Sequence, residues 1–265
     1  CCHIALDRAG IPVEEYYASE IKDIGIKVTQ YNYPDTIHIG DVNQIHYKDG
    51  ILYTENGKFN VGKIDLVAFG SPCQSFSQAM KTNMRIGLED KKRSGLFLEC
   101  YRVLKKVNPT YFLMENVGSM KVDDKNFISN LLGVEPIRIN SKLVCAALRD
   151  RLYWTNIPNV TQPEDKKIKL QDIITSGYVD REKARALLVS DSRPLTTKEC
   201  WRLMGFSDED CNRASAYVSD SALYKQAGNS IVTSCLVAIF YSLLFNDSST
   251  KWSNYIVQYK INGGN

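Results

Sequence analysis

Short apolar runs alternate with helix-like stretches over the first 160 residues of the chain. Several of the apolar runs are continuous, which is typical of parallel strands covered on both faces. Between them, residues 94–107 and 124–133 carry apolar side chains at helical spacing, and Gly133 is suited to end the second helix. The predicted strands are residues 15–21, 36–42, 63–70, 110–116 and 151–157. This alternation predicts an α/β fold with a doubly wound, mostly parallel sheet.

The pattern changes after Pro158. Residues 161–173 are polar and charged, and residues 176–193 predict one short helix with turns. A threonine N-cap followed by an apolar face predicts a further helix within residues 195–210. The chain therefore does not continue the simple strand–helix alternation of its first part.

The most apolar stretch, residues 231–245, is shorter than the roughly 20 residues that span a membrane. We interpret it as a helix buried in the core and expect no membrane segment. The tail, residues 246–265, predicts either one edge strand or no ordered element.

Composition and charge narrow the class of protein only slightly. The chain has 265 residues, 44% of them hydrophobic, and a formal net charge of +3, which permits a polyanionic partner without requiring one. Its eight cysteines include no CxxC pair, and three histidines are scattered. This pattern predicts reduced, mostly buried thiols, no metal site and a cytoplasmic location.

Polar segments follow four of the predicted strands, and ligands of doubly wound sheets bind at the carboxyl ends of strands. These segments hold Glu20, Asp41, Cys73 and Glu115, and Cys73 follows a proline in a tight turn. A thiol, a carboxylate and the arginines of the R-x-R segment 149–151 could together perform covalent catalysis. Taken singly, each has an ordinary structural explanation: a packed thiol, a solvated strand-end carboxylate, or a pair of surface arginines.

The order of four motifs is more specific. SPCQSFS at 71–77, ENV at 115–117, R-x-R at 149–151 and AGNSIV at 227–232 resemble the motifs of the DNA (cytosine-5)-methyltransferase family of bacterial and phage type. Further matches are YYASEI with Glu20, GDV with Asp41, SGLF at 94–97, and RPLTTKECWRLMGF at 193–206.

The resemblance implies a Rossmann-like fold of the class I S-adenosylmethionine-dependent methyltransferases, with a small target-recognition region. It divides the chain into a catalytic part, a reduced recognition region, a return to the catalytic part, and a tail. The corresponding ranges are 1–160, 161–192, 193–245 and 246–265.

The resemblance also implies catalytic roles for four residues. Cys73 would add to C6 of cytosine, Glu115 would hold the N3 and N4 edge, Arg151 would contact O2, and Arg149 would brace the cysteine loop. The methyl donor would be S-adenosylmethionine, with no metal. The residues implied to bind this donor are Glu20, Ile21, Asp41, Val42, Pro72, Leu96, Asn229 and Ser230.

A base stacked in a duplex cannot expose C6, so the implied target is a cytosine flipped out of double-stranded DNA. The chain is expected to act as a monomer, with a cognate restriction endonuclease as a candidate partner. The residues expected to contact DNA are Gln74, Ser77, Lys81, Arg85, Arg93 and Asn116.

The chain departs from the family pattern in three places. The first strand and its glycine-rich turn would lie before Cys1, so we expect the sequence to be a fragment. Ala147 stands where the family usually carries a glutamine. The recognition region, 161–192, is short, so we expect recognition of a short site, weak specificity, or specificity borrowed from a partner.

Three alternatives remain open from the sequence. One is a tRNA cytosine C5 methyltransferase of the same fold, although the Cys-Phe-Thr segment usual in that group is absent from residues 161–192. A second is a catalytically impaired scaffold that binds DNA. The third treats Cys73 as a redox or hydrolase thiol, for which no CxxC partner or suitably placed histidine is found.

Overall fold

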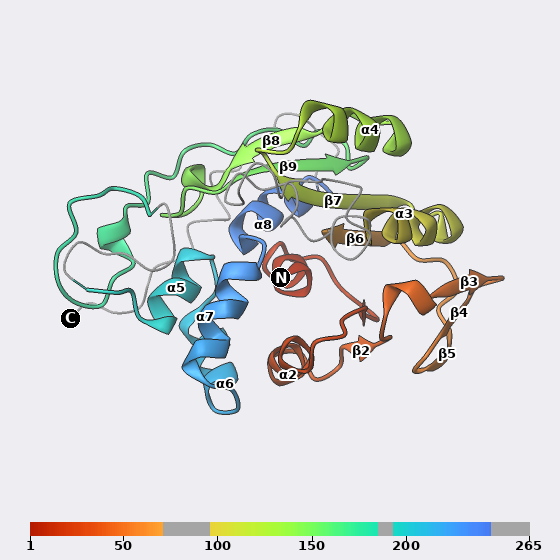
Figure 1. The fold of residues 1–265 in the computed structure, drawn as a ribbon, viewed down its shortest axis with the longest axis horizontal. Helices are drawn as coiled ribbons and strands as arrows, with labels where there is room; N and C mark the ends of the chain where they lie inside the picture. The colour runs from red at the N-terminus through yellow and green to blue at the C-terminus, as the bar shows by residue number, and fades with distance from the viewer. Residues whose placement is uncertain (71–95, 185–192, 245–265) are drawn as a thin grey trace.

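The computed structural model describes residues 1–70, 96–184 and 193–244 (Figure 1). Its largest sheet has four strands, and β6 pairs with β7 in parallel. The next strand, β9, is antiparallel to both of its neighbours. The spatial order is β6 (Leu66–Gly70), β7 (Tyr111–Val117), β9 (Asp150–Thr155) and β8 (Ile137–Asn140).

This sheet is therefore mixed, whereas the sequence predicted a mostly parallel one. The connection from β8 to β9 is short, from Asn140 to Asp150. Because a parallel pair needs a crossover of a dozen or more residues, so short a connection favours the antiparallel direction. The predicted α/β class is confirmed, with this correction to the strand directions.

Two smaller sheets precede β6. The parallel strands β1 (Tyr17–Ala18) and β2 (Ile37–His38) lie within the predicted strands 15–21 and 36–42, but they are shorter and form a sheet of their own instead of joining the main one. A three-stranded antiparallel sheet was not expected; it contains β3 (His46–Lys48), β4 (Ile51–Thr54) and β5 (Gly57–Asn60).

Among the described residues up to 184, four α-helices accompany these strands, and Figure 1 shows α3 and α4 beside the four-stranded sheet. In α3 the buried residues recur on one face, as the helical spacing predicted. Gly133 ends α4 in the left-handed conformation, with φ of 73°, which confirms its predicted role. These helices are α1 (Cys2–Arg8), α2 (Asp23–Asn32), α3 (Leu96–Val107) and α4 (Val122–Leu132).

Four more helices form the C-terminal part of the described chain. The predicted threonine cap is Thr196, which forms a capping box with Glu199 at the start of α5. In α8 every residue except Ser234 is buried, so the reading of this stretch as a core helix is confirmed. The helices are α5 (Thr197–Leu203), α6 (Asp208–Ser215), α7 (Asp220–Asn229) and α8 (Thr233–Tyr241).

The predicted helix over residues 176–193 is wrong for its described part, 176–184. Ala184 forms a parallel bridge with Ala147 instead. Its N–H donates to the carbonyl of Ala146, and its carbonyl accepts from Leu148, both at 2.8 Å. These backbone bonds to the core satisfy the groups that a helix would have used.

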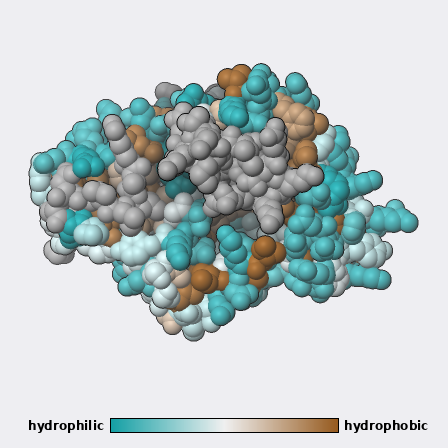
Figure 2. All heavy atoms as spheres, viewed as in Figure 1, coloured by the Kyte–Doolittle hydropathy of each residue, from teal (hydrophilic) through white to brown (hydrophobic). Residues whose placement is uncertain are grey.

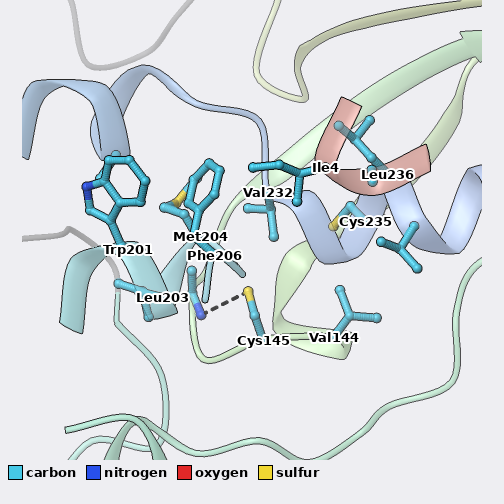
Figure 3. Packing of buried hydrophobic residues seen from close by; sticks show 14 of the residues in the cluster. Ile4, Val144, Cys145, Trp201, Leu203, Met204, Phe206, Val232, Cys235 and Leu236 are labelled. Carbon is cyan, nitrogen blue, oxygen red and sulfur yellow. Dashed lines mark hydrogen bonds between the residues drawn. The ribbon is translucent and has the colours of Figure 1, made fainter. Parts of the chain in front are cut away.

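The largest core cluster joins α1 and α8 to the helices and loops of the C-terminal part (Figure 3). Figure 3 shows Ile4 of α1 beside Val232 and Leu236, near Trp201 and Met204. On the face seen in Figure 2, hydrophobic residues form small patches separated by hydrophilic ones. Within the described ranges, no helix is long and apolar enough to cross a membrane.

Candidate active site

The register of β6 on β7 places Glu115 at the end of β6. Gly70, the last residue of β6, pairs with Glu115. A Cβ on Gly70 would lie 3.3 Å from the carboxylate oxygen Oε2 of Glu115, so the carboxylate lies across this glycine. Cys73 lies three residues further along the chain and outside the described residues.

Glu115 is paired with Arg151 from the neighbouring strand. The antiparallel register of β7 and β9 places Val117 opposite Arg151, so Glu115 and Arg151 lie diagonally on the same face. Arg151 Nε lies 2.8 Å from Glu115 Oε1, and the two side chains are only 17% and 12% exposed. The strand pairing therefore brings these two predicted catalytic residues into direct contact.

The environment of Glu115 favours its protonated form. Burial raises the pKa of this carboxyl, and the positive charges of Arg151 and Arg149 partly oppose that shift. A carboxyl with a raised pKa can carry a proton nearer to neutral pH, which suits a group that donates a hydrogen bond or a proton.

Arg149, the residue before β9, connects this strand to the C-terminal end of α7. Its guanidinium donates to the carbonyls of Gly228 at 3.1 Å and Ser230 at 3.2 Å. Its own N–H donates to Ser141 Oγ at 3.1 Å, and its carbonyl accepts from Ser141 N–H. Arg149 thus brings the predicted donor-binding residues Asn229 and Ser230 next to the sheet.

The loop before Arg149 is fastened to the predicted recognition region. Lys183 Nζ donates to three backbone carbonyls, those of Lys142 at 2.7 Å, Cys145 at 3.1 Å and Ile168 at 2.5 Å. Three donors meeting three acceptors saturate the ammonium group. Ala147, at the position where the family usually has glutamine, is buried, and its carbonyl accepts from Ser141 Oγ.

The predicted donor-binding residues Glu20 and Asp41 follow the paired strands β1 and β2. Ser19 Oγ donates to the carbonyl of Gly40 at 2.7 Å, which ties the two strand ends together. Glu20 Oε1 accepts from the N–H groups of Ile21 and Lys22, both at 2.9 Å.

Asp41 is held by a turn of its own and by a more distant residue. Its Oδ1 accepts from the N–H of Asn43 at 3.0 Å and from that residue's side-chain amide at 2.8 Å. The N–H of Asp41 donates to Glu55 Oε1 at 2.7 Å. Sequence reasoning missed Glu55, although the Asn56-Gly57 dipeptide beside it is a hairpin signal.

The other predicted site residues differ in how far they are exposed to solvent. Val42 and Leu96 are half-buried and Ile21 is 67% exposed, whereas Asn116 is fully buried. That burial disagrees with direct contact between the Asn116 side chain and DNA. The predicted residues that lie outside the described ranges are Pro72, Cys73, Gln74, Ser77, Lys81, Arg85 and Arg93. Within the described ranges, no group of three or more metal-ligating side chains is found.

Comparison with solved structures identifies the class of fold. The chain superposes on the crystal structure of the S. pombe Dnmt2 methyltransferase with a TM-score of 0.63. The match covers 91% of this chain and 94% of that one at 21% identity. The described architecture is thus an α/β fold found in methyltransferases.

The family follows from the sequence. Residues 1–134 and 138–244 match the family model of the C-5 cytosine-specific DNA methylases, and the chain belongs to that family. A type II methyltransferase from Lactococcus lactis subsp. cremoris, M2.ScrFI, is 25% identical in an alignment of 239 positions. The alignment covers 68% of this chain and 66% of the relative. M.NgoBV from Neisseria gonorrhoeae, also a type II methyltransferase, is 32% identical over 129 residues, covering 49% of this chain and 27% of that protein. The chain thus spans less than two thirds of either relative.

Proposed function

We propose that the protein transfers a methyl group from S-adenosylmethionine to C5 of a cytosine in DNA, with Cys73 as the nucleophile. The observation that carries this proposal is the largely buried Glu115–Arg151 pair beside Gly70. The Glu115 carboxyl, whose pKa is raised, is held beside Gly70, and Gly70 lies three residues before Cys73 in the sequence. Membership of the C-5 cytosine-specific DNA methylase family supports the same chemistry.

In the proposed reaction, the Cys73 thiolate forms a bond to C6 of the cytosine, and the ring electrons move toward C5. Glu115 donates to N3 and thereby stabilises the charge that develops on the ring. C5 then takes the methyl group from the sulfonium of S-adenosylmethionine, and S-adenosylhomocysteine is released. A base removes the proton from C5, the bond between sulfur and C6 breaks, and the thiolate is regenerated.

Arg151 and Arg149 act in this proposal mainly as supports. Arg151 holds Glu115 at 2.8 Å, while Arg149 fixes the segment 228–230 against the sheet. The proposed contact of Arg151 with the cytosine O2 would use donors of its guanidinium that do not bind Glu115, because a guanidinium has five.

The ends of β1 and β2 fit the adenosine part of the donor. Glu20 uses Oε1 for two backbone amides, so a ribose hydroxyl could bind at Oε2. Both ring nitrogens of His38 are buried without a hydrogen-bond partner in the described structure, and the Glu20 charge acts on this ring. A ligand hydroxyl beside Glu20 would supply the polar neighbour that the imidazole lacks.

We propose double-stranded DNA as the substrate, with the target cytosine flipped out of the helix. In this proposal residues 161–184 contact the DNA, and Lys183 holds them against the loop before Arg149. The names of the two type II methyltransferase relatives support a cognate restriction endonuclease as a partner.

Trapping on DNA that contains 5-fluorocytosine tests the proposal. Fluorine at C5 cannot leave as the proton does, so a covalent complex between protein and DNA should accumulate when the donor is present. Cys73→Ser should form no complex, and an RNA of matched sequence tests the tRNA alternative. Donor binding without trapping on either nucleic acid would instead favour the scaffold alternative.

A further inference from the structure

A hairpin outside the strand ladder contacts the loop that carries Asp41. The turn between β4 and β5 includes Glu55 and Asn56. Glu55 Oε1 accepts from the N–H of Asp41 at 2.7 Å, and Asn56 Nδ2 donates to the carbonyl of His38 at 3.0 Å. Two consecutive side chains of one turn therefore hold both ends of the segment His38–Asp41.

Gly40, in the middle of this segment, is shaped to receive Glu55. Its φ is +75°, in the left-handed region that favours glycine. A Cβ at Gly40 would lie 2.0 Å from Glu55 Oε1, so a side chain there could not coexist with the present position of the glutamate. Ser19 Oγ binds the Gly40 carbonyl, so the loop is held by β1 as well as by the hairpin.

The hairpin itself is fixed to the body of the protein. Leu52 of β4 is buried in one cluster with Ile39 and Ile45, and Phe59 of β5 packs against that cluster. Arg102 of α3 donates to the carbonyls of Ile45 at 2.9 Å and Val42 at 3.2 Å, which anchors the chain between the loop and the hairpin. The turn is thus attached well enough to hold its partner loop in place.

We propose that Glu55 is a positioning residue for the methyl donor: it fixes the backbone of Asp41 so that the Asp41 carboxylate meets the donor's adenine amino group. This inference rests on the proposed function, because it needs a donor at the ends of β1 and β2. Glu55 acts through Asp41 and touches no reacting atom.

The test uses the full chain of 265 residues and S-adenosylhomocysteine as the binding probe in isothermal titration calorimetry. Glu55→Ala should weaken binding roughly fivefold to tenfold, because a charge-assisted hydrogen bond to the loop is lost. Glu55→Gln keeps an acceptor oxygen and should restore most of the affinity. Lys58→Ala, which changes an exposed residue of the same hairpin, serves as the matched control and should bind as the wild type does.

Two further readouts separate positioning from a general structural role. The melting temperature should be the same for Glu55→Ala and Lys58→Ala, and amide exchange of Asp41 should accelerate only in Glu55→Ala. If the wild type binds S-adenosylhomocysteine and Glu55→Ala binds it equally tightly, the inference is overturned while the proposed function stays intact. A wild-type chain that binds no S-adenosylhomocysteine would overturn both.

The close approach at Gly40 gives an independent test of the same contact. Gly40→Ala should weaken binding more than Glu55→Ala, because the new methyl group clashes with Glu55 and the backbone is strained. Combining the two substitutions removes the clash, so the double variant should bind more tightly than Gly40→Ala alone. Additive losses would show that Glu55 and Gly40 are not coupled and would count against the proposal.

Discussion

The two ends of the proposed site are held in place in different ways. At the catalytic end, Glu115 and Arg151 project from paired strands, so the register of β7 on β9 determines their contact. At the donor end, Glu20 and Asp41 lie in loops beyond a pair of two-residue strands. These loops rely on side-chain hydrogen bonds from Ser19 and Glu55.

This difference indicates where each end is vulnerable. A strand ladder keeps its geometry when one side chain changes, so substitutions at the catalytic end should affect chemistry more than shape. A loop held by a few side chains loses its geometry when one of them is removed, so substitutions at the donor end should affect binding.

Glu115→Gln should produce the largest change. The amide keeps the size of the side chain but cannot donate a proton, so the methylation rate should fall about a thousandfold. Single-turnover transfer of a labelled methyl group to DNA measures this rate. Donor affinity should stay within about twofold of the wild type, since the ladder beneath Glu115 is unchanged; a loss of donor binding as large as the loss of rate would contradict the contrast.

Arg149→Lys should affect stability next most strongly. Lysine cannot reach the carbonyls of Gly228 and Ser230 with a planar fork, so the free energy of unfolding should fall by about 2 kcal/mol. Urea denaturation followed by circular dichroism measures this change. Arg138→Lys is a suitable control because its ion pair with Asp150 is largely exposed, and it should cost much less.

Lys183→Met should have a smaller effect, about 1 kcal/mol on the free energy of unfolding. The substitution keeps the apolar stem but removes the donors to three carbonyls, those of Lys142 and Cys145 in the loop and that of Ile168. Lys183→Arg should recover part of the loss. Since the loop before Arg149 would loosen, we also expect a higher KM for DNA. An unchanged KM would mean that the hydrogen bonds of Lys183 do not affect DNA binding.

The pH dependence of stability is the finest test. Burial raises the pKa of Glu115 in the folded protein above its unfolded value. The resulting stabilisation is complete below the unfolded pKa and is lost as the pH rises through the folded pKa. The free energy of unfolding of the wild type should therefore decline relative to Glu115→Gln as the pH rises from about 4, the pKa of an unfolded glutamate. Parallel curves would mean that the carboxyl titrates alike in both states.

The sequence was sufficient for the parts of the fold in which hydrophobic pattern and tertiary contacts agree. Continuous apolar runs predicted β6 and β7, and an apolar stretch with no charged residue predicted the buried helix α8. The motif resemblance also predicted that Glu115 and Arg151 belong to one site, and the register of β7 on β9 brings the two side chains into contact.

The missed features have two kinds of cause. The antiparallel strands β3 to β5 are joined by local turns, and the Asp49-Gly50 dipeptide, with both φ angles positive, is a hairpin signal that the sequence analysis did not use; the other two missed features depend on contacts distant in the sequence. Residues 176–184 carry helix-like spacing, but backbone bonds between Ala184 and the loop at Ala146–Leu148 replace the helix. The contact of Glu55 with Asp41 is likewise a tertiary feature that sequence patterns do not contain.

The hairpin that carries Glu55 is bounded by turns and adds no strand to the four-stranded sheet. Insertions or deletions in it would therefore leave the catalytic ladder intact. Affinity for the proposed methyl donor could in this way change during evolution, or be adjusted by engineering, without any compensating change around the proposed nucleophile, Cys73. A library confined to residues 54–57 would be the natural place to begin such tuning.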